Sequence, residues 1–147
     1  MDDSPQAASY SWFDHTADVG LEVIAPSLEA LFETAARALF DLLAGPPARG
    51  AGLVEVEREI RVTGADTEEL MVRWLSELLY LHDTEGLVFD RFDISEIRND
   101  LLAGRAAGER HDPGRRRLRR EIKAVTYHQL LVRREGHGWK ARVVFDV

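Results

Sequence analysis

The second half of the chain, after Gly86, carries a series of alternating apolar and polar segments with no helical pattern between them. They begin at Leu87 and, more weakly, at Glu96 and Leu101, and two more span residues 122–134 and 139–147. Consecutive strands without long crossovers pair antiparallel, whereas a parallel sheet needs a helix or a similar connection between its strands. This half therefore predicts a mixed or antiparallel sheet and argues against a doubly wound parallel fold.

The first half interleaves strands with two amphipathic helices. Strand-like alternation covers residues 19–25 and 54–62, and apolar residues at helical spacing cover 28–43 and 70–79. Together the two halves predict an α+β, two-layer single domain over residues 10–147, behind a flexible N-terminus of residues 1–9.

Local signals mark the ends of both helices. Ser27 stands at the N-cap position of the first helix, which Gly45-Pro46-Pro47 should end. Asp66 and Glu69 form a capping-box pair ahead of the second helix. We expect the polar residues 80–86 to form a turn after that helix.

Composition excludes several classes of function. The chain has no cysteine, which rules out disulfides, thiolate zinc sites and cysteine nucleophiles. It has neither an apolar run long enough to span a bilayer nor a signal peptide at its acidic start, so we expect a soluble, cytoplasmic protein without membrane contact. A net charge of -7 argues against broad attraction to nucleic acid.

The charge is unevenly distributed, because six arginines fall within the eleven residues Arg110–Arg120. A charge run of this kind is usually a solvated loop. The alternative is a docking patch for an acidic partner or a phosphate backbone. The sequence leaves both interpretations open.

Chemically capable residues gather at the two ends of the alternating pattern. Asp18 opens the first strand three residues after His15, and Asp146 lies near the end of the last strand, on the face opposite its apolar row. Oxygens of Asp146 and of the Val147 carboxylate or carbonyl suit Ca²⁺ or Mg²⁺. Each residue also has an ordinary interpretation: a turn for Asp18, a structural histidine for His15 and a solvated carboxylate for Asp146.

Two further polar clusters occur along the chain. His82, Asp83 and Glu85 follow the second helix, where an imidazole suits the helix dipole. Lys123 and His128 lie at opposite parity, so a regular strand would place them on different faces. The chain has no phosphate-binding glycine loop, HExxH pair or GxSxG elbow.

Four separated motifs resemble the archease family. They are His15-Thr16-Ala17-Asp18, the stretch 81–87, Glu121-Ile122-Lys123-Ala124-Val125-Thr126-Tyr127-His128, and Val144-Phe145-Asp146-Val147. The resemblance covers nearly the whole chain, in order. It implies an archease-like fold and a cytoplasmic accessory protein, not an enzyme, that activates an RtcB-type tRNA-splicing RNA ligase by promoting guanylylation and repeated turnover.

The resemblance also implies a functional site. A divalent metal, Ca²⁺ or Mg²⁺, would be held by Asp18, Asp146 and Val147, with Lys123 as a further functional position. RNA contact would be indirect or through Arg110–Arg120. Activation by metal delivery and activation by conformational bias both remain open, as do a free-standing metal-dependent phosphohydrolase and a chaperone-like interaction module.

Overall fold

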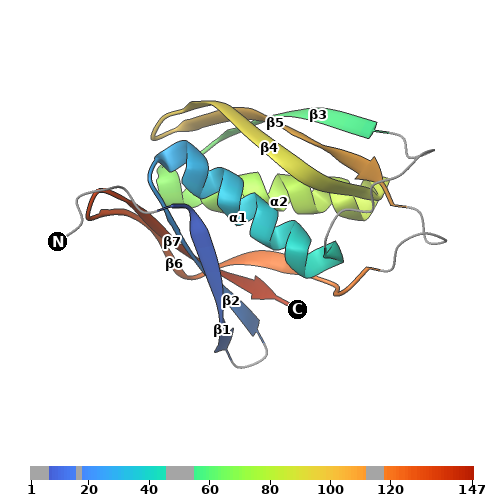
Figure 1. Cartoon of the computed structure of the whole chain (residues 1–147), viewed down its shortest axis with the longest axis horizontal. Helices are drawn as coiled ribbons and strands as arrows, with labels where there is room; N and C mark the ends of the chain where they lie inside the picture. The colour runs from blue at the N-terminus through green and yellow to red at the C-terminus, as the bar shows by residue number, and fades with distance from the viewer. Residues whose placement is uncertain (1–6, 16–17, 46–54, 112–117) are drawn as a thin grey trace.

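The computed structural model describes residues 7–15, 18–45, 55–111 and 118–147 (Figure 1). Along the described chain the elements are β1 (Ser9–His15), β2 (Asp18–Ala25), α1 (Leu28–Ala44), β3 (Glu55–Thr63), α2 (Thr67–Glu85), β4 (Leu87–Ile97), β5 (Leu101–Arg110), β6 (Ala124–Glu135) and β7 (Gly138–Asp146). The expected order of strand, helix, strand, helix and then successive strands is confirmed.

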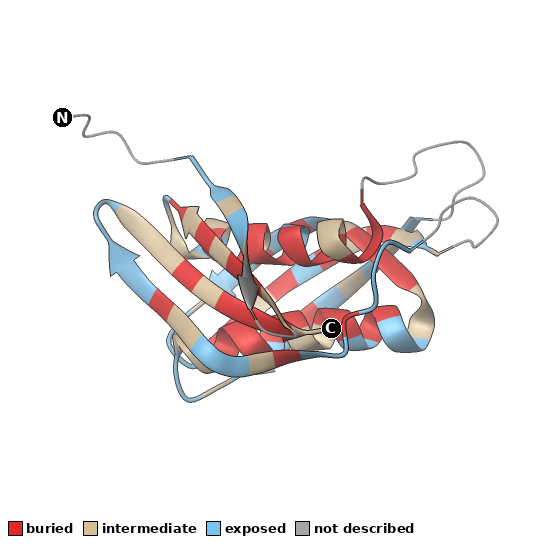
Figure 2. Cartoon of the chain, turned by 90° about the horizontal axis from the view of Figure 1, so that it is seen from below, coloured by how far each residue is buried: buried red, intermediate tan, exposed pale blue. Residues whose placement is uncertain are grey.

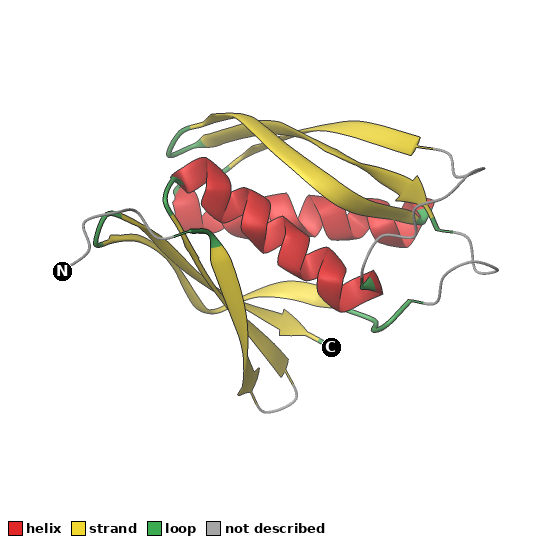
Figure 3. Cartoon of the chain, viewed as in Figure 1, coloured by secondary structure: helices red, strands yellow, loops and turns green. Residues whose placement is uncertain are grey.

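The described strands form two antiparallel sheets. One sheet has the order β1-β2-β7-β6 and the other the order β3-β5-β4. Both helices lie between the sheets: α1 contacts β2 and β4, and α2 contacts β6 and β3 (Figures 1 and 3). The α+β class with two principal helices is confirmed. We expected a single sheet covered by the helices. Instead, the two helices lie between two sheets, and each helix buries surface against both.

The helix starts follow the local signals. The Ser27 hydroxyl accepts a hydrogen bond from the Ala30 N–H at 3.1 Å. The Asp66 carboxylate accepts one from the Glu69 N–H at 2.8 Å, and Glu69 in turn accepts one from the backbone just before the helix. The capping prediction is thus confirmed at both helices.

The end of α2 corrects one expectation. Residues 80–85 continue the helix instead of forming a turn, and Gly86 ends it with φ of 70° in the left-handed region. His82 is buried on this last turn, and its Nδ1 lies 2.9 Å from the Leu87 carbonyl oxygen. The polar sequence suggested a turn, but packing of this side chain against β4 extends the helix.

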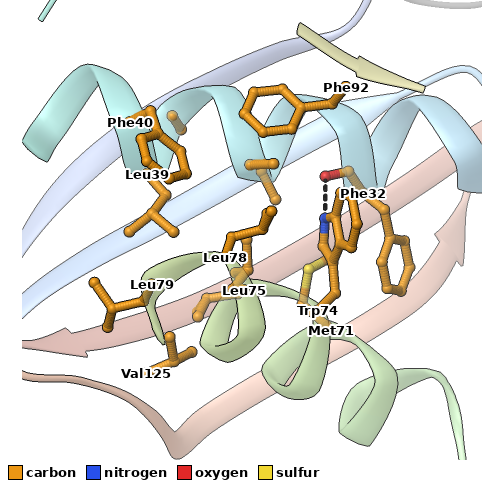
Figure 4. Packing of buried hydrophobic residues seen from close by; sticks show 14 of the residues in the cluster. Phe32, Leu39, Phe40, Met71, Trp74, Leu75, Leu78, Leu79, Phe92 and Val125 are labelled. Carbon is orange, nitrogen blue, oxygen red and sulfur yellow. Dashed lines mark hydrogen bonds between the residues drawn. The ribbon is translucent and has the colours of Figure 1, made fainter. Parts of the chain in front are cut away.

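One apolar core fills the space between the sheets. Trp74 is fully buried on α2, and its indole N–H donates to the Phe32 carbonyl oxygen of α1 at 3.0 Å (Figure 4). The ring of Phe40 packs on Phe89 and Phe92. Buried positions recur along both helices and alternate with more exposed ones along the strands (Figure 2). The core thereby fixes which face of the four-stranded sheet points outward.

The late strands form two hairpins, as expected. β4 and β5 meet at a short turn after Ile97, and β6 and β7 meet at Gly136, whose φ is 60°. Some predicted details lie outside the described residues: the flexible N-terminus through residue 6, Pro46 and Pro47, Val54, and residues 112–117 of the arginine segment.

Candidate functional site

Strand pairing brings the start of the first predicted strand and the end of the last into one row across the sheet. In the four-stranded sheet, His15 is the backbone partner of Asp18, Asp18 is the partner of Asp146, and Asp146 is the partner of Ala124. The row crosses β1, β2, β7 and β6 near the end of β7 (Figure 1). Two acidic residues far apart in sequence are therefore neighbours at one end of the sheet.

The acidic pair lies on the outer face of this sheet. Ala141, Val143 and Phe145 are fully buried toward the helices, and Asp146 has the opposite parity. Because directly paired residues project from the same face, Asp18 shares the outer face with Asp146. Both residues are half-buried. Like charges directly opposite each other destabilise a sheet, and a cation bound between them would reduce their repulsion.

Lys123 adjoins the acidic pair through its backbone. Its N–H donates to the Asp146 carbonyl oxygen at 2.7 Å, although β6 itself begins only at Ala124. Asp146 is thus held on one side by pairing to β2 and on the other by Lys123. The Lys123 side chain is exposed and forms no ion pair within the described residues. We call Asp18, Asp146, Val147 and Lys123 the acidic row.

An arginine on the same outer face, Arg142, is already paired. Arg142 binds the Glu22 carboxylate at 2.7 Å and lies over the Phe13 ring at 5.6 Å. Hydrogen bonds from Arg142 hold the pKa of Glu22 below its usual range. The Phe13 ring also covers Gly20, where any Cβ would collide with it. Arg142 is therefore committed to Glu22, four residues along the strand pair from Asp18 and Asp146.

A large irregularity interrupts β6 beside the row. Thr126 pairs with Val144 and Leu131 pairs with Arg142, so four residues of β6 stand opposite the single residue between them on β7. Gln129 has φ of 53°, and Tyr127 is 59% exposed. The Thr126 hydroxyl donates to the Val144 carbonyl oxygen at 2.9 Å and anchors the start of this bulge.

The β6 bulge changes the interpretation of the Lys123 motif. The regular-strand parity that would separate Lys123 from His128 does not apply, because Lys123 precedes the strand and His128 lies in the bulge. Bulges and left-handed non-glycine residues concentrate near functional sites. Sequence reasoning included Tyr127 in the Lys123 motif but missed Gln129. The signal was an exposed aromatic within a motif whose alternation fails.

Other predicted polar residues lie away from the row. The buried His82 ring packs edge-on against Phe40, inside the core. His111 donates its backbone N–H to the Gly86 carbonyl oxygen at 2.6 Å, and Arg110 donates to the Glu85 carbonyl oxygen at 2.6 Å. This start of the arginine segment therefore caps the end of α2. Of its described residues, Arg119 and Arg120 lie elsewhere, against α1.

The donor chemistry of the row is that of a hard-cation site. Among the described residues no cluster of three or more His, Cys, Asp or Glu side chains is arranged to bind a metal. Two opposed carboxylates and the main-chain oxygens of Val147 are the donors that the row offers. Oxygen donors of this kind fit Ca²⁺ or Mg²⁺, which also accept water as ligands.

Comparisons with known proteins agree with the described fold. Residues 10–147 match the archease protein family. The chain is similar to protein archease of Methanosarcina mazei, with 39% identity over 97% of this chain and 98% of the relative. Protein archease of Pyrococcus furiosus is 40% identical, over 92% and 96% of the two chains.

Two solved structures share the architecture. The solution structure of Methanobacterium thermoautotrophicum protein 1598 has a TM-score of 0.74 and 37% identity, over 94% of this chain and 98% of that one. The crystal structure of an archease from Thermotoga maritima, described as a possible chaperone, has a TM-score of 0.64 and 29% identity, over 92% and 94%. No helix in the described part of this chain is long and apolar enough to cross a membrane. With its family match spanning nearly all of its length and relatives this similar, the chain belongs to the archease family.

Proposed function

We propose that this protein activates an RtcB-type RNA ligase by promoting guanylylation of the ligase, so that the ligase turns over repeatedly in tRNA splicing. The observation that carries the proposal is the acidic row, in which Asp18 faces Asp146 and Lys123 is bound to the Asp146 backbone. Membership of the archease family supports it. The protein acts as an accessory factor in the cytoplasm, without catalysis of its own.

Asp18, Asp146 and an oxygen of Val147 hold a divalent metal, Ca²⁺ or Mg²⁺. When bound, the cation neutralises the facing carboxylates and offers a positive centre to phosphate oxygens. The β2–β7 pairing keeps the two carboxylates together, and the Lys123 N–H fixes the Asp146 backbone. The exposed Lys123 ammonium supplies a mobile positive charge for a phosphate or for a carboxylate of the ligase.

The row assists the ligase by positioning. Guanylylation joins a nucleotide to a ligase histidine as pyrophosphate leaves, so the step depends on held phosphates and in-line geometry. The row inserts near the ligase active site, and binding there also favours the guanylylation-competent conformation by differential affinity. The exposed β6 bulge, which borders the row, extends the surface that contacts the ligase.

The test is single-turnover guanylylation of an RtcB-type ligase with GTP, with and without this protein. We expect the protein to accelerate the step in the presence of Ca²⁺ or Mg²⁺ and to lose its effect in a chelator. The isolated protein is assayed in parallel for phosphatase and nuclease activity. Hydrolysis by the protein alone, without acceleration of the ligase, would replace the proposal with a metal-dependent phosphohydrolase.

A further inference from the structure

A polar cleft lies on the helix side of the four-stranded sheet, away from the outer face that carries the acidic row. It is bounded by the edge strand β1, the C-terminal end of α1 and the segment that precedes β6. Its volume is about 320 Å³, within the range of small-molecule sites. The residues that line it are Tyr10, Trp12, Asp41, Leu42, Arg119 and Arg120.

The two arginines of the cleft are anchored by their backbone. The N–H groups of Arg119 and Arg120 both donate to the Leu43 carbonyl oxygen, at 2.7 and 3.3 Å. Gly45 ends α1 with φ of 72°, and a Cβ there would lie 2.7 Å from the Arg119 side chain. A glycine is thus required both by the backbone and by the stem of Arg119. These contacts fix the backbone of the two arginines at the cleft, while their side chains are exposed.

The cleft is positively charged even though the chain is acidic. Its carboxylate, Asp41, accepts a hydrogen bond from the Tyr10 hydroxyl at 2.5 Å. Burial and this hydrogen bond raise the pKa of Tyr10 to about 12, and the positive charges of Arg37 and Arg119 oppose the rise. Within the described residues, the guanidinium groups of Arg119 and Arg120 form no ion pair. Both side chains are exposed, and a guanidinium group can bind an anion by charge-assisted hydrogen bonds.

An indole ring completes the cleft. Trp12 is 37% exposed, although large aromatic side chains are buried elsewhere in the core. Its ring packs edge-on against Tyr10 at 5.9 Å and contacts Phe145 at 6.2 Å, which holds it in place. A fixed, exposed indole beside two available guanidinium groups is a combination that binds a base by stacking and its phosphate by charge.

We propose that this cleft binds a nucleotide, with the base on Trp12 and the phosphate on Arg119 and Arg120. The same chemistry is offered by a free nucleotide and by the end of a single-stranded RNA. Arg120 precedes Lys123 by three residues, so the backbones of the two residues lie at most roughly 10 Å apart. The binding itself does not depend on any ligase.

Another cleft, between β3 and α2, provides a matched control. It is lined by residues of β3 and α2 and also contains an exposed tyrosine, Tyr80, and two arginines. There, however, Arg73 is paired with Glu69 at 3.2 Å, and Glu77 adds another carboxylate to the lining. We expect this control cleft to have no affinity for nucleotides.

Calorimetric titration of the full chain tests the proposal with GMP, guanosine, inorganic phosphate and a short single-stranded RNA. GMP should bind more tightly than guanosine or phosphate. Trp12→Leu should weaken GMP binding about tenfold, whereas Trp12→Phe should retain most of it. Arg120→Gln should weaken binding and lower the dependence on salt by about one charge. Arg61→Gln and Tyr80→Leu in the control cleft should have no effect.

The same titrations distinguish a free nucleotide from the end of a single-stranded RNA as the ligand. Tighter binding of the RNA than of GMP assigns the cleft to an RNA end, and equal or weaker binding assigns it to a free nucleotide. Thermal melts show which variants are folded. If Trp12→Leu is unfolded, the binding measured for Trp12→Phe and Arg120→Gln decides the test. The proposal is overturned if GMP and the RNA fail to bind at millimolar concentration, or if the control-cleft variants weaken binding as much as Arg120→Gln does.

Discussion

At the scale of single residues, the outer face of the four-stranded sheet carries one cross-strand pair of opposite charges and one of like charges. Glu22 and Arg142 neutralise each other across β2 and β7. One end of the same two strands places Asp18 opposite Asp146, a pairing of like charges. Like charges directly opposite each other are unfavourable in a sheet unless another group compensates them.

Replacing Asp18 or Asp146 by Asn should abolish ligase activation and Ca²⁺ binding while preserving the fold. The free energy of unfolding of the metal-free protein should change by no more than about 1 kcal/mol, because repulsion is relieved as any local hydrogen bond is weakened. Calorimetry, urea unfolding and the guanylylation assay measure the three properties. Asp93→Asn, at an exposed acid of the other sheet, is the control. Full activation by either row variant would exclude that carboxylate from the mechanism.

Lys123→Met should slow ligase guanylylation and leave metal binding intact. Methionine keeps much of the apolar length of lysine but removes its charge, and the backbone hydrogen bond to Asp146 does not depend on the side chain. The chain has one other lysine, Lys140, so Lys140→Met is a matched control that should activate normally. A single-turnover rate equal to wild type at saturating Lys123→Met protein would end the role assigned to this ammonium.

Tyr10 should make stability depend on alkaline pH. The pKa of an unfolded tyrosine is near 10, and burial and Asp41 raise it to about 12 in the folded chain. Between these values the unfolded state loses its proton first, so the contribution of Tyr10 falls as pH rises from 10 to 12. At pH 7, Tyr10→Phe should cost about 1–2 kcal/mol. Urea unfolding across this window should show the difference from wild type shrinking; a constant difference would contradict the assignment.

At the scale of elements, the two helices are joined to each other as well as to the sheets. The Trp74 indole of α2 is fully buried and donates to a main-chain carbonyl of α1. β6, in contrast, is locally irregular. Its bulge departs from regular strand pairing, exposes Tyr127 and holds Gln129 in the left-handed region. The four-stranded sheet therefore packs against the helices on one face and contains a locally irregular strand at its edge.

Trp74→Phe should lower the free energy of unfolding by about 2–3 kcal/mol. The smaller ring leaves a cavity and removes the hydrogen bond to the Phe32 carbonyl. Trp139→Phe, at a half-buried position on β7, should cost less than about 1 kcal/mol and serves as the control. Equal losses in urea unfolding for the two variants would show that the bond between the helices contributes nothing.

At the scale of the whole molecule, one core links both sheets. Buried side chains from α1 and α2 belong to the same cluster as residues of β2, β4, β6 and β7. The net charge is -7, yet positive charge gathers at Arg119 and Arg120. These two arginines can therefore attract an anionic partner only at short range, because the attraction is screened within about 8 Å at physiological ionic strength.

Unfolding should be a single cooperative transition. Both helices pack on both sheets, so neither sheet can separate without exposing the shared core. Tryptophan fluorescence, which reports Trp74 among others, and far-UV circular dichroism should give coincident urea curves. Two separated midpoints would show that the three-stranded sheet unfolds independently.

Local chemistry made much of this fold predictable from the sequence. The caps at Ser27 and Asp66 need only neighbouring N–H groups, and strand alternation reports which side of each strand is buried. The same locality explains the errors. Residues 80–85 are polar, but the tertiary packing of His82 keeps them helical, and the β6 bulge depends on how that strand fits against β7.

The sequence by itself determined the helices, the strands, the hairpins and the residue types of the acidic row, because periodicity and capping act over a few residues. Only the tertiary structure decided that the strands form two sheets around the helices, that Asp18 stands opposite Asp146, and that Trp12 meets Arg119 and Arg120 in one cleft. These arrangements depend on the register between strands distant in sequence. Register is set by the burial of the whole core, which no local pattern contains.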